Sequence, residues 1–553
     1  MRLLPFVVGV VVLAASPCAQ DFAALRGQLA DFVDRRCAHC HDADSRRGGI
    51  DFDAMVASAD ERDWLAAARV WRKAAWRVLD HDMPPRDEAE RPSNAERVAF
   101  AGLVDAGLRA AAAAVPPVPR APTLRRLNRV QWRQAVAALC GVEVEAERFL
   151  PEDPIGSGFD VVGDVQIVSP LHVESALLAT DAVLDAVEAT PGRLAALLGE
   201  PTPDAAVSAA ALQALLRAAF RRPPRPDELA TRLELAREVH TASGDARLAA
   251  RRVLQSVLLA PAFLFRIEAD DEAAATGTVR ALDDHELSAR LAFFLWASPP
   301  DAALAARADR GELRSTEVLR AELRRMLADP RARALADEFG AQWLGYRGIL
   351  RIARDVRRYQ FDEALRAAMY EEARLGVDRI LREDRNVLEL LHADWTFVDA
   401  RLAKHYGLAE PPSPGMQLVA LDDARRGGVL GWAATATVTA LPLRTSPVLR
   451  GRFVLEDLCG DPPPPPPPDV GALQEDDRQP DGSTLRAQLE RHRRDARCAA
   501  CHARLDPFGL VLENFDAIGA WRTQHETQPL DTRVVLASGE GIAEIADLKG
   551  WLL

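Results

Sequence analysis

The stretch Cys37-Ala38-His39-Cys40-His41 places two cysteines three positions apart and a histidine directly after the second one. This Cys-x-x-Cys-His pattern is the attachment signature of a c-type haem. The two thiols can form thioether bonds to the vinyl groups of the porphyrin, and the histidine that follows is then placed to bind the iron. The sequence therefore predicts that Cys37 and Cys40 bind haem c covalently and that His41 is an iron ligand.

The residues around this motif have the pattern of a small helical domain. Residues 22–36 repeat apolar side chains at helical spacing and lead directly into the motif, and further helices are expected at 61–79 and 94–113. A helix, the haem motif, a helix, a methionine-containing loop and a helix is the order of a class I cytochrome c. No stretch alternates apolar and polar residues for long. The predicted fold class is therefore mainly α, with a class I cytochrome c-like domain followed by a multidomain helical body.

The loop after the second of these helices contains Met83, the predicted sixth ligand of the iron. A thioether sulfur is soft and favours ferrous iron, so it raises the reduction potential. Pro84 and Pro85 follow, and they cannot continue a helix. Two alternatives stay open, because Met83 could be a packing residue and His81 could bind the iron instead. His39, inside the motif, has no assigned role.

The same cysteine spacing returns near the other end of the chain as Cys498-Ala499-Ala500-Cys501-His502. It predicts a second haem c that is bound by Cys498 and Cys501, with His502 as iron ligand. Met416 is the last methionine, so the sixth ligand is an upstream residue, a histidine such as His525, or absent. The competing interpretation uses the two cysteines for zinc or a disulfide, but no second cysteine pair lies nearby to complete a zinc site.

The first 20 residues have the layout of a secretory signal, with Arg2 at the positive end, an apolar run and then small residues. A retained anchor is the alternative, although the apolar run is short for a bilayer. Covalent haem attachment takes place outside the cytoplasm in bacteria, so both features indicate export to the periplasm or cell envelope. No later segment is apolar enough to cross a membrane, and no transmembrane segment is expected after removal of the signal.

Length and charge limit the possible functions. A chain of 553 residues predicts several domains, and a formal net charge of −13 argues against nucleic-acid binding. The seven prolines at 462–468 predict a stiff polyproline II segment or, alternatively, a ligand for a proline-binding domain. The expected boundaries are a signal peptide at 1–20, a cytochrome c-like haem domain at 21–114, a proline-rich linker at 115–123, helical domains at 124–200, 201–275 and 276–410, a C-terminal domain with the polyproline segment and the second motif at 411–530, and a truncated remnant of a further domain at 531–553.

Several blocks of the sequence resemble one known family. They are Leu127-Asn128-Arg129, Phe220-Arg221-Arg222-Pro223, Arg444-Thr445-Ser446-Pro447-Val448-Leu449-Arg450-Gly451, the second haem motif with Leu505-Asp506-Pro507-Phe508-Gly509-Leu510 after it, and Leu512-Glu513-Asn514-Phe515-Asp516. In this order they resemble the large exported planctomycete-type cytochrome c proteins, which have an N-terminal cytochrome c domain and a run of helical domains of unknown function. The resemblance implies a helical, multidomain haem protein and brings no agreed substrate. It also implies that a further C-terminal domain is truncated here.

These features together predict electron transfer by an exported c-type cytochrome with a redox partner protein. The alternative is a haem-dependent oxidoreductase or peroxidase-like enzyme that acts at the C-terminal haem, and a third possibility is a surface-assembly protein in which haem is structural. The sequence has no glycine-rich phosphate loop, no His-Glu-x-x-His pair and no Gly-x-Ser-x-Gly elbow. No catalytic residue is therefore assigned, and the substrate stays unknown.

Some residues near the motifs allow two interpretations each. Arg444, Arg450 and Arg522 could bind the propionates of a haem, because guanidinium pairs well with carboxylate, or they could hydrogen-bond turns and helix ends. Cys140 and Cys459 could form a disulfide outside the cytoplasm, or each could be a buried thiol.

Overall fold

The computed structural model of the chain describes residues 22–79, 81–85, 88, 90–115, 124–202, 205–268, 280–355, 357–463, 484–494, 496–525, 527–536 and 539–553, without the side chains of 496–501. The signal-like segment 1–20, most of the proline-rich linker and prolines 464–468 lie outside the described residues. The chain divides into two compact units, residues 1–119 with 535–541 and residues 120–534 with 542–553, and each is described by itself.

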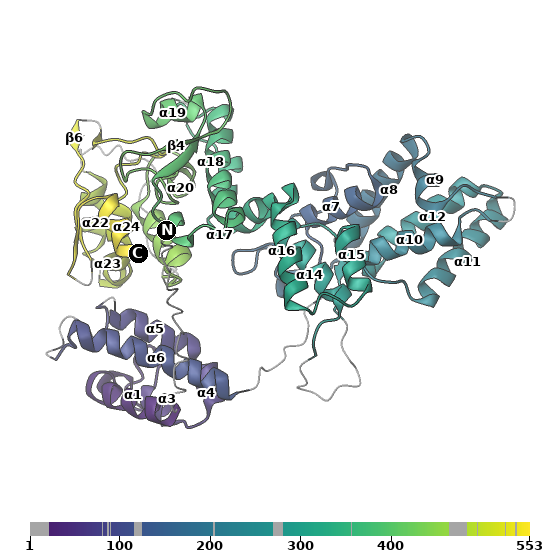
Figure 1. Cartoon of the computed structure of the whole chain (residues 1–553). Helices are drawn as coiled ribbons and strands as arrows, with labels where there is room; N and C mark the ends of the chain where they lie inside the picture. Colours follow the sequence, from purple (N-terminus) through teal and green to yellow (C-terminus); the bar gives the residue numbers. More distant parts are fainter. Residues whose placement is uncertain are drawn as a thin grey trace, which may run out of the picture. The chain divides into compact units, whose positions relative to one another are not determined.

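The first unit is a bundle of helices around an aromatic core (Figure 1). Trp64 and Trp71 are buried and stack with ring centroids 4.8 Å apart, and Phe32 stacks on Phe100 at 4.3 Å. Burial of each large apolar side chain contributes about 1.5–3 kcal/mol, so these rings account for much of the stability of this bundle. The helices are α1 (Phe22–Arg36), α2 (Ala38–His41), α3 (Phe52–Ala57), α4 (Glu61–Ala66), α5 (Ala68–Leu79) and α6 (Asn94–Ala114).

The helices of the first unit follow local sequence signals closely. α1 and α6 confirm the predicted helices, and α6 begins with a capping box in which Ser93 and Glu96 each bond the other's backbone N–H. The single helix predicted for 61–79 is instead divided at Ala67. The N–H of Ala67 is shared between the carbonyl oxygens of Asp63 and Leu65, and this tighter turn ends α4.

Helices α7–α13 of the second unit enclose a core of leucine, valine and alanine side chains. The sequence also predicts helices at 205–220, 226–242 and 244–260, and the structure confirms them as α10, α11 and α12. Cys140, in the last turn of α7, is a wholly buried free thiol, which contradicts the alternative of a disulfide with Cys459. The helices are α7 (Arg129–Cys140), α8 (Pro170–Ala189), α9 (Arg193–Leu198), α10 (Ala209–Phe220), α11 (Pro226–Ser243), α12 (Ala246–Leu258) and α13 (Pro261–Leu264).

The next helices of this unit are α14 (Asp284–Trp296), α15 (Ala302–Asp309), α16 (Thr316–Ala328) and α17 (Ala341–Trp343). Asp283 with Glu286 three residues later predicts a helix cap, and the structure confirms it, because the side chain of Asp283 accepts the N–H of Glu286 at 2.7 Å. The sequence also predicts a helix at about 331–344, but this segment is irregular and contains a π-helix at Leu335–Gly340. The hydroxyl of Tyr346 donates to the carbonyl of Ala336, and a side chain that enters the hydrogen-bond ladder in this way distorts a helix.

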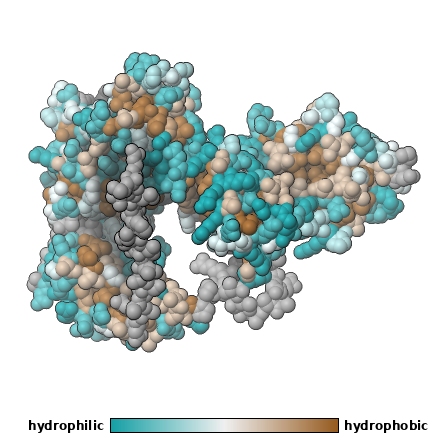
Figure 2. Space-filling model, viewed as in Figure 1, coloured by the Kyte–Doolittle hydropathy of each residue, from teal (hydrophilic) through white to brown (hydrophobic). Residues whose placement is uncertain are grey.

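The surface over α14–α16 is rich in ion pairs, and Figure 2 shows the corresponding teal area on the visible face. Arg325 binds both Asp301, at 2.9 Å, and Glu322, at 2.8 Å. Arg331 also binds Asp301, at 3.0 Å. Elsewhere on this face polar and apolar residues are interspersed (Figure 2). Among the described residues, no helix has both the length and the apolar composition that a membrane crossing requires.

The last part of the second unit combines helices with short strands. Its helices are α18 (Glu363–Arg382), α19 (Ala400–Tyr406), α20 (Ala433–Val438), α21 (Pro447–Phe453), α22 (Leu485–His492), α23 (Ala496–Leu510) and α24 (Ile545–Leu552). The strands of the chain form two-stranded sheets, β1 (Arg125–Arg126) with β2 (Phe265–Arg266), β3 (Trp395–Val398) with β4 (Gln417–Ala420), β5 (Gln524–His525) with β6 (Gln528–Pro529), and β7 (Val534–Val535) with β8 (Gly541–Ile542). The mainly α fold class is confirmed, and the expected lack of a large sheet holds for the described residues.

Two glycines let α21 and α23 pack backbone against backbone. A Cβ atom on Gly509 of α23 would overlap the carbonyl group of Pro447, and a Cβ atom on Gly451 of α21 would overlap that of Leu505. Protein interiors are close-packed, so a main-chain atom cannot move aside as the end of a long side chain can. The helix that carries the second haem motif is therefore fixed against the helix of the Arg-Thr-Ser-Pro block.

α24 is attached to the same unit through a buried lysine. The Nζ atom of Lys549 donates to the carbonyl oxygens of Ala424, Arg426 and Gly427 at 2.7, 2.8 and 2.7 Å. Burial, with a contribution from the nearby Arg426 guanidinium, lowers the pKa of Lys549 to about 7. This helix lies within the segment 531–553 that was expected to be a domain remnant, and it packs as an integral part of the second unit.

Glu372 of α18 is a wholly buried carboxyl group, and we expect it to make the stability of the second unit depend on pH. Its oxygens accept hydrogen bonds from Thr396, at 2.6 Å, and from Tyr406. Burial raises the pKa of Glu372 from 4.5 to about 7, against the effect of these two donors. A raised pKa means that the folded state holds its proton when the unfolded state has lost it. The stabilisation is complete below pH 4.5 and disappears as the pH rises through 7.

Between pH 4.5 and 8 the wild type should therefore lose on the order of 3 kcal/mol of unfolding free energy through this group. In Glu372→Gln that loss should be absent, because the amide does not titrate. Calorimetric unfolding across this pH range measures the difference. Glu363→Gln changes an exposed glutamate of the same helix, and its pH profile should follow the wild type. Equal pH profiles for Glu372→Gln and the wild type would contradict the prediction.

Candidate functional site

The first unit contains a cavity of about 630 Å³ beside the Cys-x-x-Cys-His motif. This volume is within the roughly 300–1,000 Å³ range of small-molecule sites. Much of its wall is apolar and includes Ile50, Phe52, Val70, Val78 and Phe100. The four residues that the sequence predicts for the first haem all line it, namely Cys37, Cys40, His41 and Met83. The structure thus brings this predicted set together around one space.

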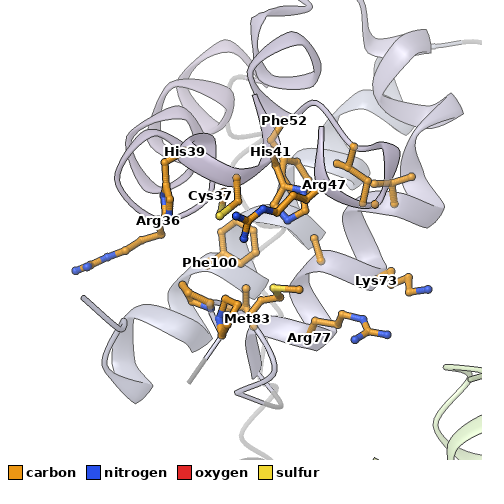
Figure 3. A pocket seen from close by; sticks show the side chains of 18 of the residues that line it. Arg36, Cys37, His39, His41, Arg47, Phe52, Lys73, Arg77, Met83 and Phe100 are labelled. Atoms are coloured by element: carbon orange, nitrogen blue, oxygen red, sulfur yellow. The ribbon is translucent and has the colours of Figure 1, made fainter. Parts of the chain in front are cut away.

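Cys37, the first residue of the motif, lies between α1 and α2, and the other four residues of the motif form α2. The N–H of Cys37 donates to the carbonyl oxygen of Val33 at 2.8 Å, and the N–H of His41 donates to that of Cys37 at 3.0 Å. Figure 3 shows the side chains of Cys37 and His41 on the same side of the cavity. Burial, with smaller effects of Asp53 and Cys40, raises the pKa of the Cys37 thiol to about 12. The thiol is therefore protonated at physiological pH.

Met83 reaches the cavity from the side opposite His41 (Figure 3). Its loop is held by Arg97 of α6, whose side chain is buried. One guanidinium nitrogen of Arg97 donates to the carbonyl oxygens of Val78, at 2.6 Å, and Met83, at 2.8 Å. The N–H of Met83 in turn donates to the carbonyl oxygen of Arg77 at 3.1 Å. These bonds fix the position of the sulfur-bearing residue relative to the end of α5.

The two other histidines near this site have different surroundings. His81, the competing ligand, is not among the described residues that line the cavity, and its carbonyl oxygen accepts a bond from Arg91 at 2.6 Å. His39 had no assigned role, and its Nε2 atom lies 3.4 Å from Oε1 of Glu88. The ligand atoms of His39, Cys40 and Glu88 lie within 4.8 Å of one another. Because Cys40 belongs to the haem motif, this group is part of the same site.

The residues around the cavity fit a haem c, with one exception. The Nδ1 atom of His41 is buried and has no hydrogen-bond partner among the described residues, whereas metal-bound histidines usually pair this second nitrogen. A haem also carries two propionates, and the cations of the cavity wall suit carboxylates. They are Arg36, Arg47, Arg69, Lys73 and Arg77. The cavity wall thus offers two thiols, an imidazole, a thioether and several cations, which are the groups that bind a haem c.

The second motif lies in the first turns of α23. The sequence predicts one charged helix over 485–497 before the motif, but α22 already ends at His492 and α23 begins at Ala496. The Nδ1 atom of His502 lies 2.9 Å from Oδ1 of Asp506, whose side chain is wholly buried. The side chains of Cys498 and Cys501 are outside the described residues, so their attachment to a haem stays a prediction.

The structure adds a histidine to the possible sixth ligands of this site. His492, the last residue of α22, packs its ring against that of His502 with centroids 4.7 Å apart. His525, the histidine considered from the sequence, lies in β5, and its Nδ1 is 3.0 Å from a guanidinium nitrogen of Arg522. His492 is therefore the histidine in ring contact with the predicted proximal ligand.

The arginines of the family-like blocks bind the protein itself. Arg450 is buried and donates to two carbonyl oxygens of the segment after α23, both at 2.8 Å, and to Glu513 at 3.2 Å. Arg522 donates to the other oxygen of Glu513 at 2.9 Å. Arg444 donates to the carbonyl oxygen of Thr445 at 2.8 Å. These contacts correspond to the turn and helix-end interpretation.

Two residues that position the sites were missed from the sequence. Asp506 could have been found, because it follows His502 by four residues in a helix, and this spacing puts both side chains on one face. Arg97 offered no such signal, since its bond to the carbonyl of Met83 joins residues 14 positions apart across a loop. A buried arginine is also rare enough that an exposed position is the default expectation.

Five family models match consecutive parts of the chain. They are Planctomycete cytochrome C at residues 37–87 and four proteins of unknown function, DUF1587 at 125–189, DUF1595 at 208–268, DUF1592 at 282–408 and DUF1588 at 426–525. The first match begins at Cys37 and includes Met83, and the last contains the second Cys-x-x-Cys-His motif. Neither the curated proteins nor the solved structures contain a match to the chain.

Proposed function

This chain belongs to the planctomycete-type multidomain cytochrome c proteins, and on that premise we propose that it is exported and transfers single electrons through two covalently bound haems. The observation that carries the proposal is the cavity of the first unit. Cys37, Cys40, His41 and Met83 all line it, which is the complete residue set for attachment and axial ligation of one haem c.

The arrangement of the first site favours electron transfer over catalysis. When bound, the haem supplies a one-electron couple between ferric and ferrous iron. His41 and Met83 approach the space from opposite sides, so both axial positions would be filled by the protein. A site with two protein ligands leaves no position on the metal for a substrate, and its potential is set by the ligands and their burial.

The remaining parts of the proposal rest on the sequence. A second haem at Cys498, Cys501 and His502 is supported by the motif and by a histidine whose Nδ1 is hydrogen-bonded and whose Nε2 has no hydrogen-bond partner among the described residues. Export to the periplasm or cell envelope is supported by the signal-like residues 1–20. A separate redox protein would deliver or accept the electrons, since the four other family models bring no known substrate.

The number of haems tests this proposal directly. The full chain, produced together with a haem-maturation system, should contain two haems by pyridine haemochrome assay, and its mass should show the loss of the signal segment. The double variant Cys37→Ser/Cys40→Ser should lose one haem, and Cys498→Ser/Cys501→Ser should lose the other.

Cys140→Ser is the matched control, because Cys140 lies in neither motif, and it should keep both haems. A wild type without covalent haem would refute the proposal, and a wild type with one haem would refute its second half. Binding of carbon monoxide to the reduced protein then reports whether the iron at His502 has an open position, which would favour catalysis there.

A further inference from the structure

We propose that Asp506 is a positioning residue of the second haem, whose carboxylate holds the imidazole of His502 and thereby makes this haem the lower-potential one of the two. The inference rests on the proposed function, because it requires a haem that is attached through Cys498 and Cys501. It goes further by assigning a role to a residue outside the Cys-x-x-Cys-His motif and by ordering the two potentials.

The geometry of the pair defines which histidine nitrogen can bind a metal. His502 and Asp506 lie one turn apart on the same face of α23, and Nδ1 is 2.9 Å from Oδ1. This contact uses Nδ1. Among the described residues nothing is hydrogen-bonded to Nε2, so Nε2 is the nitrogen left for an iron atom. The carboxylate thus fixes both the orientation of the ring and the identity of the donor atom.

The surroundings of Asp506 point to this histidine contact as its main interaction. The side chain of Asp506 is wholly buried, and its second oxygen, Oδ2, makes no hydrogen bond in the described part of the chain. Among the described side chains, Arg493 pairs with Asp506, and its Nε lies 3.6 Å from Oδ2. A buried carboxylate reduces stability unless it is well paired. One hydrogen bond and one long ion pair are poor compensation, so structural stability alone does not account for a carboxylate at this position.

The hydrogen bond has a definite electronic consequence for the iron. A carboxylate that accepts the Nδ1–H of a metal-bound histidine draws the proton away from the ring and makes Nε2 a stronger donor. A stronger donor stabilises ferric iron more than ferrous iron, so the reduction potential falls. Burial of Asp506 increases this effect, because the charge is little screened by water.

In the described residues of the first site, no carboxylate is bonded to His41 in this way. The Nδ1 atom of His41 is buried and has no hydrogen-bond partner among the described residues, and the soft sulfur of Met83 would hold the same iron. Both features favour ferrous iron. Because both features of the first site and the carboxylate of the second site act in the same direction, the His502 haem should be oxidised at potentials where the His41 haem is still reduced.

The test is a spectroscopic redox titration of the full, haem-loaded chain and its Asp506→Asn variant. The amide keeps the size of the side chain but removes the charge. We expect the ferric-to-ferrous equilibrium of the second haem to move at least tenfold towards ferrous iron, which is about 59 mV for one electron. The first haem is an internal reference, and its potential should not change.

Asp461→Asn is the matched control. Asp461 is also buried and pairs with Arg504 of α23, but it is not the hydrogen-bond partner of His502. Its replacement removes a comparable buried charge and should change the equilibrium of the second haem far less than tenfold. An equal shift in both variants would overturn the inference, because it would show a general charge effect instead of a histidine bond.

The outcomes separate this inference from the proposed function. One haem per wild-type chain overturns both the second haem and the role of Asp506. Two haems with an unchanged potential in Asp506→Asn overturn the inference and leave the proposed function intact. If Asp506→Asn does not fold, Asp506→Glu keeps a carboxylate in a displaced position, and the same titration should show a smaller shift in the same direction. No shift in that variant would also overturn the inference.

Discussion

Replacement of Met83 by alanine is expected to lower the midpoint potential of the first haem by on the order of 100 mV. The sulfur is the only soft ligand that the described cavity wall offers opposite His41. Its loss leaves water or a harder side chain at the sixth position, and harder ligands stabilise ferric iron. The weak sulfur-to-iron absorption band near the red end of the spectrum should disappear in the same variant.

Redox titration and the ferric absorption spectrum measure this result, and Met55→Ala is the control. Met55 packs against the same hydrophobic core but does not line the cavity in the described structure. Its replacement removes a similar apolar volume, so it should reduce stability without a change of potential or spectrum. A Met83→Ala protein with the wild-type band would show that another residue is the ligand, and His81→Ala would then be the next variant to test.

Replacement of Gly509 by alanine is expected to have the largest effect on stability. The added methyl group would overlap the carbonyl group of Pro447, so α21 and α23 would have to separate. Overpacking of a core costs about 1–3 kcal/mol, and contact with a fixed main-chain atom belongs at the upper end. If the unfolding free energy falls by about 3 kcal/mol, backbone amides that exchange through unfolding should do so roughly a hundredfold faster. Exchange of backbone amides in α21 and α23, measured by mass spectrometry, reports it.

The control for this variant is Gly550→Ala in α24 of the same unit. Nothing lies within 4 Å of the Cβ position of Gly550. Alanine is the better helix former by about 1 kcal/mol, so this substitution should leave exchange unchanged or slow it. If the backbone amides of α21 and α23 exchange as slowly in Gly509→Ala as in the wild type, the two helices do not pack through this glycine.

The part of the first site that could be predicted consists of residues that lie close together in the sequence. The spacing of Cys37, Cys40 and His41 is set by one turn of chain, so a pattern of five residues defines their relative positions. The position of Met83 near the motif was predictable because a short loop at the end of a helix can reach only a few positions. The cap of α14 at Asp283 is likewise a local arrangement, and the structure confirms it.

The parts that could not be predicted depend on contacts between distant residues. Lys549 would be expected in solvent, yet it donates to carbonyl groups more than 120 positions earlier in the chain. The π-helix at Leu335–Gly340 depends on the hydroxyl of Tyr346, which follows it. The close approach of α21 to α23 depends on Gly451 and Gly509, and sequence spacing alone does not specify that approach.

The cavity beside Cys37 also bears on how the protein matures. In the folded first unit the thiol of Cys37 is largely enclosed, and the space around it is lined with apolar side chains. Such a surface is unfavourable when only water fills it, and a domain of this size has only about 5–15 kcal/mol of total stability. Attachment of the cofactor and closure of the helices would then be one coupled event. A first unit that has not yet bound haem would therefore be less tightly folded than the haem-bound unit.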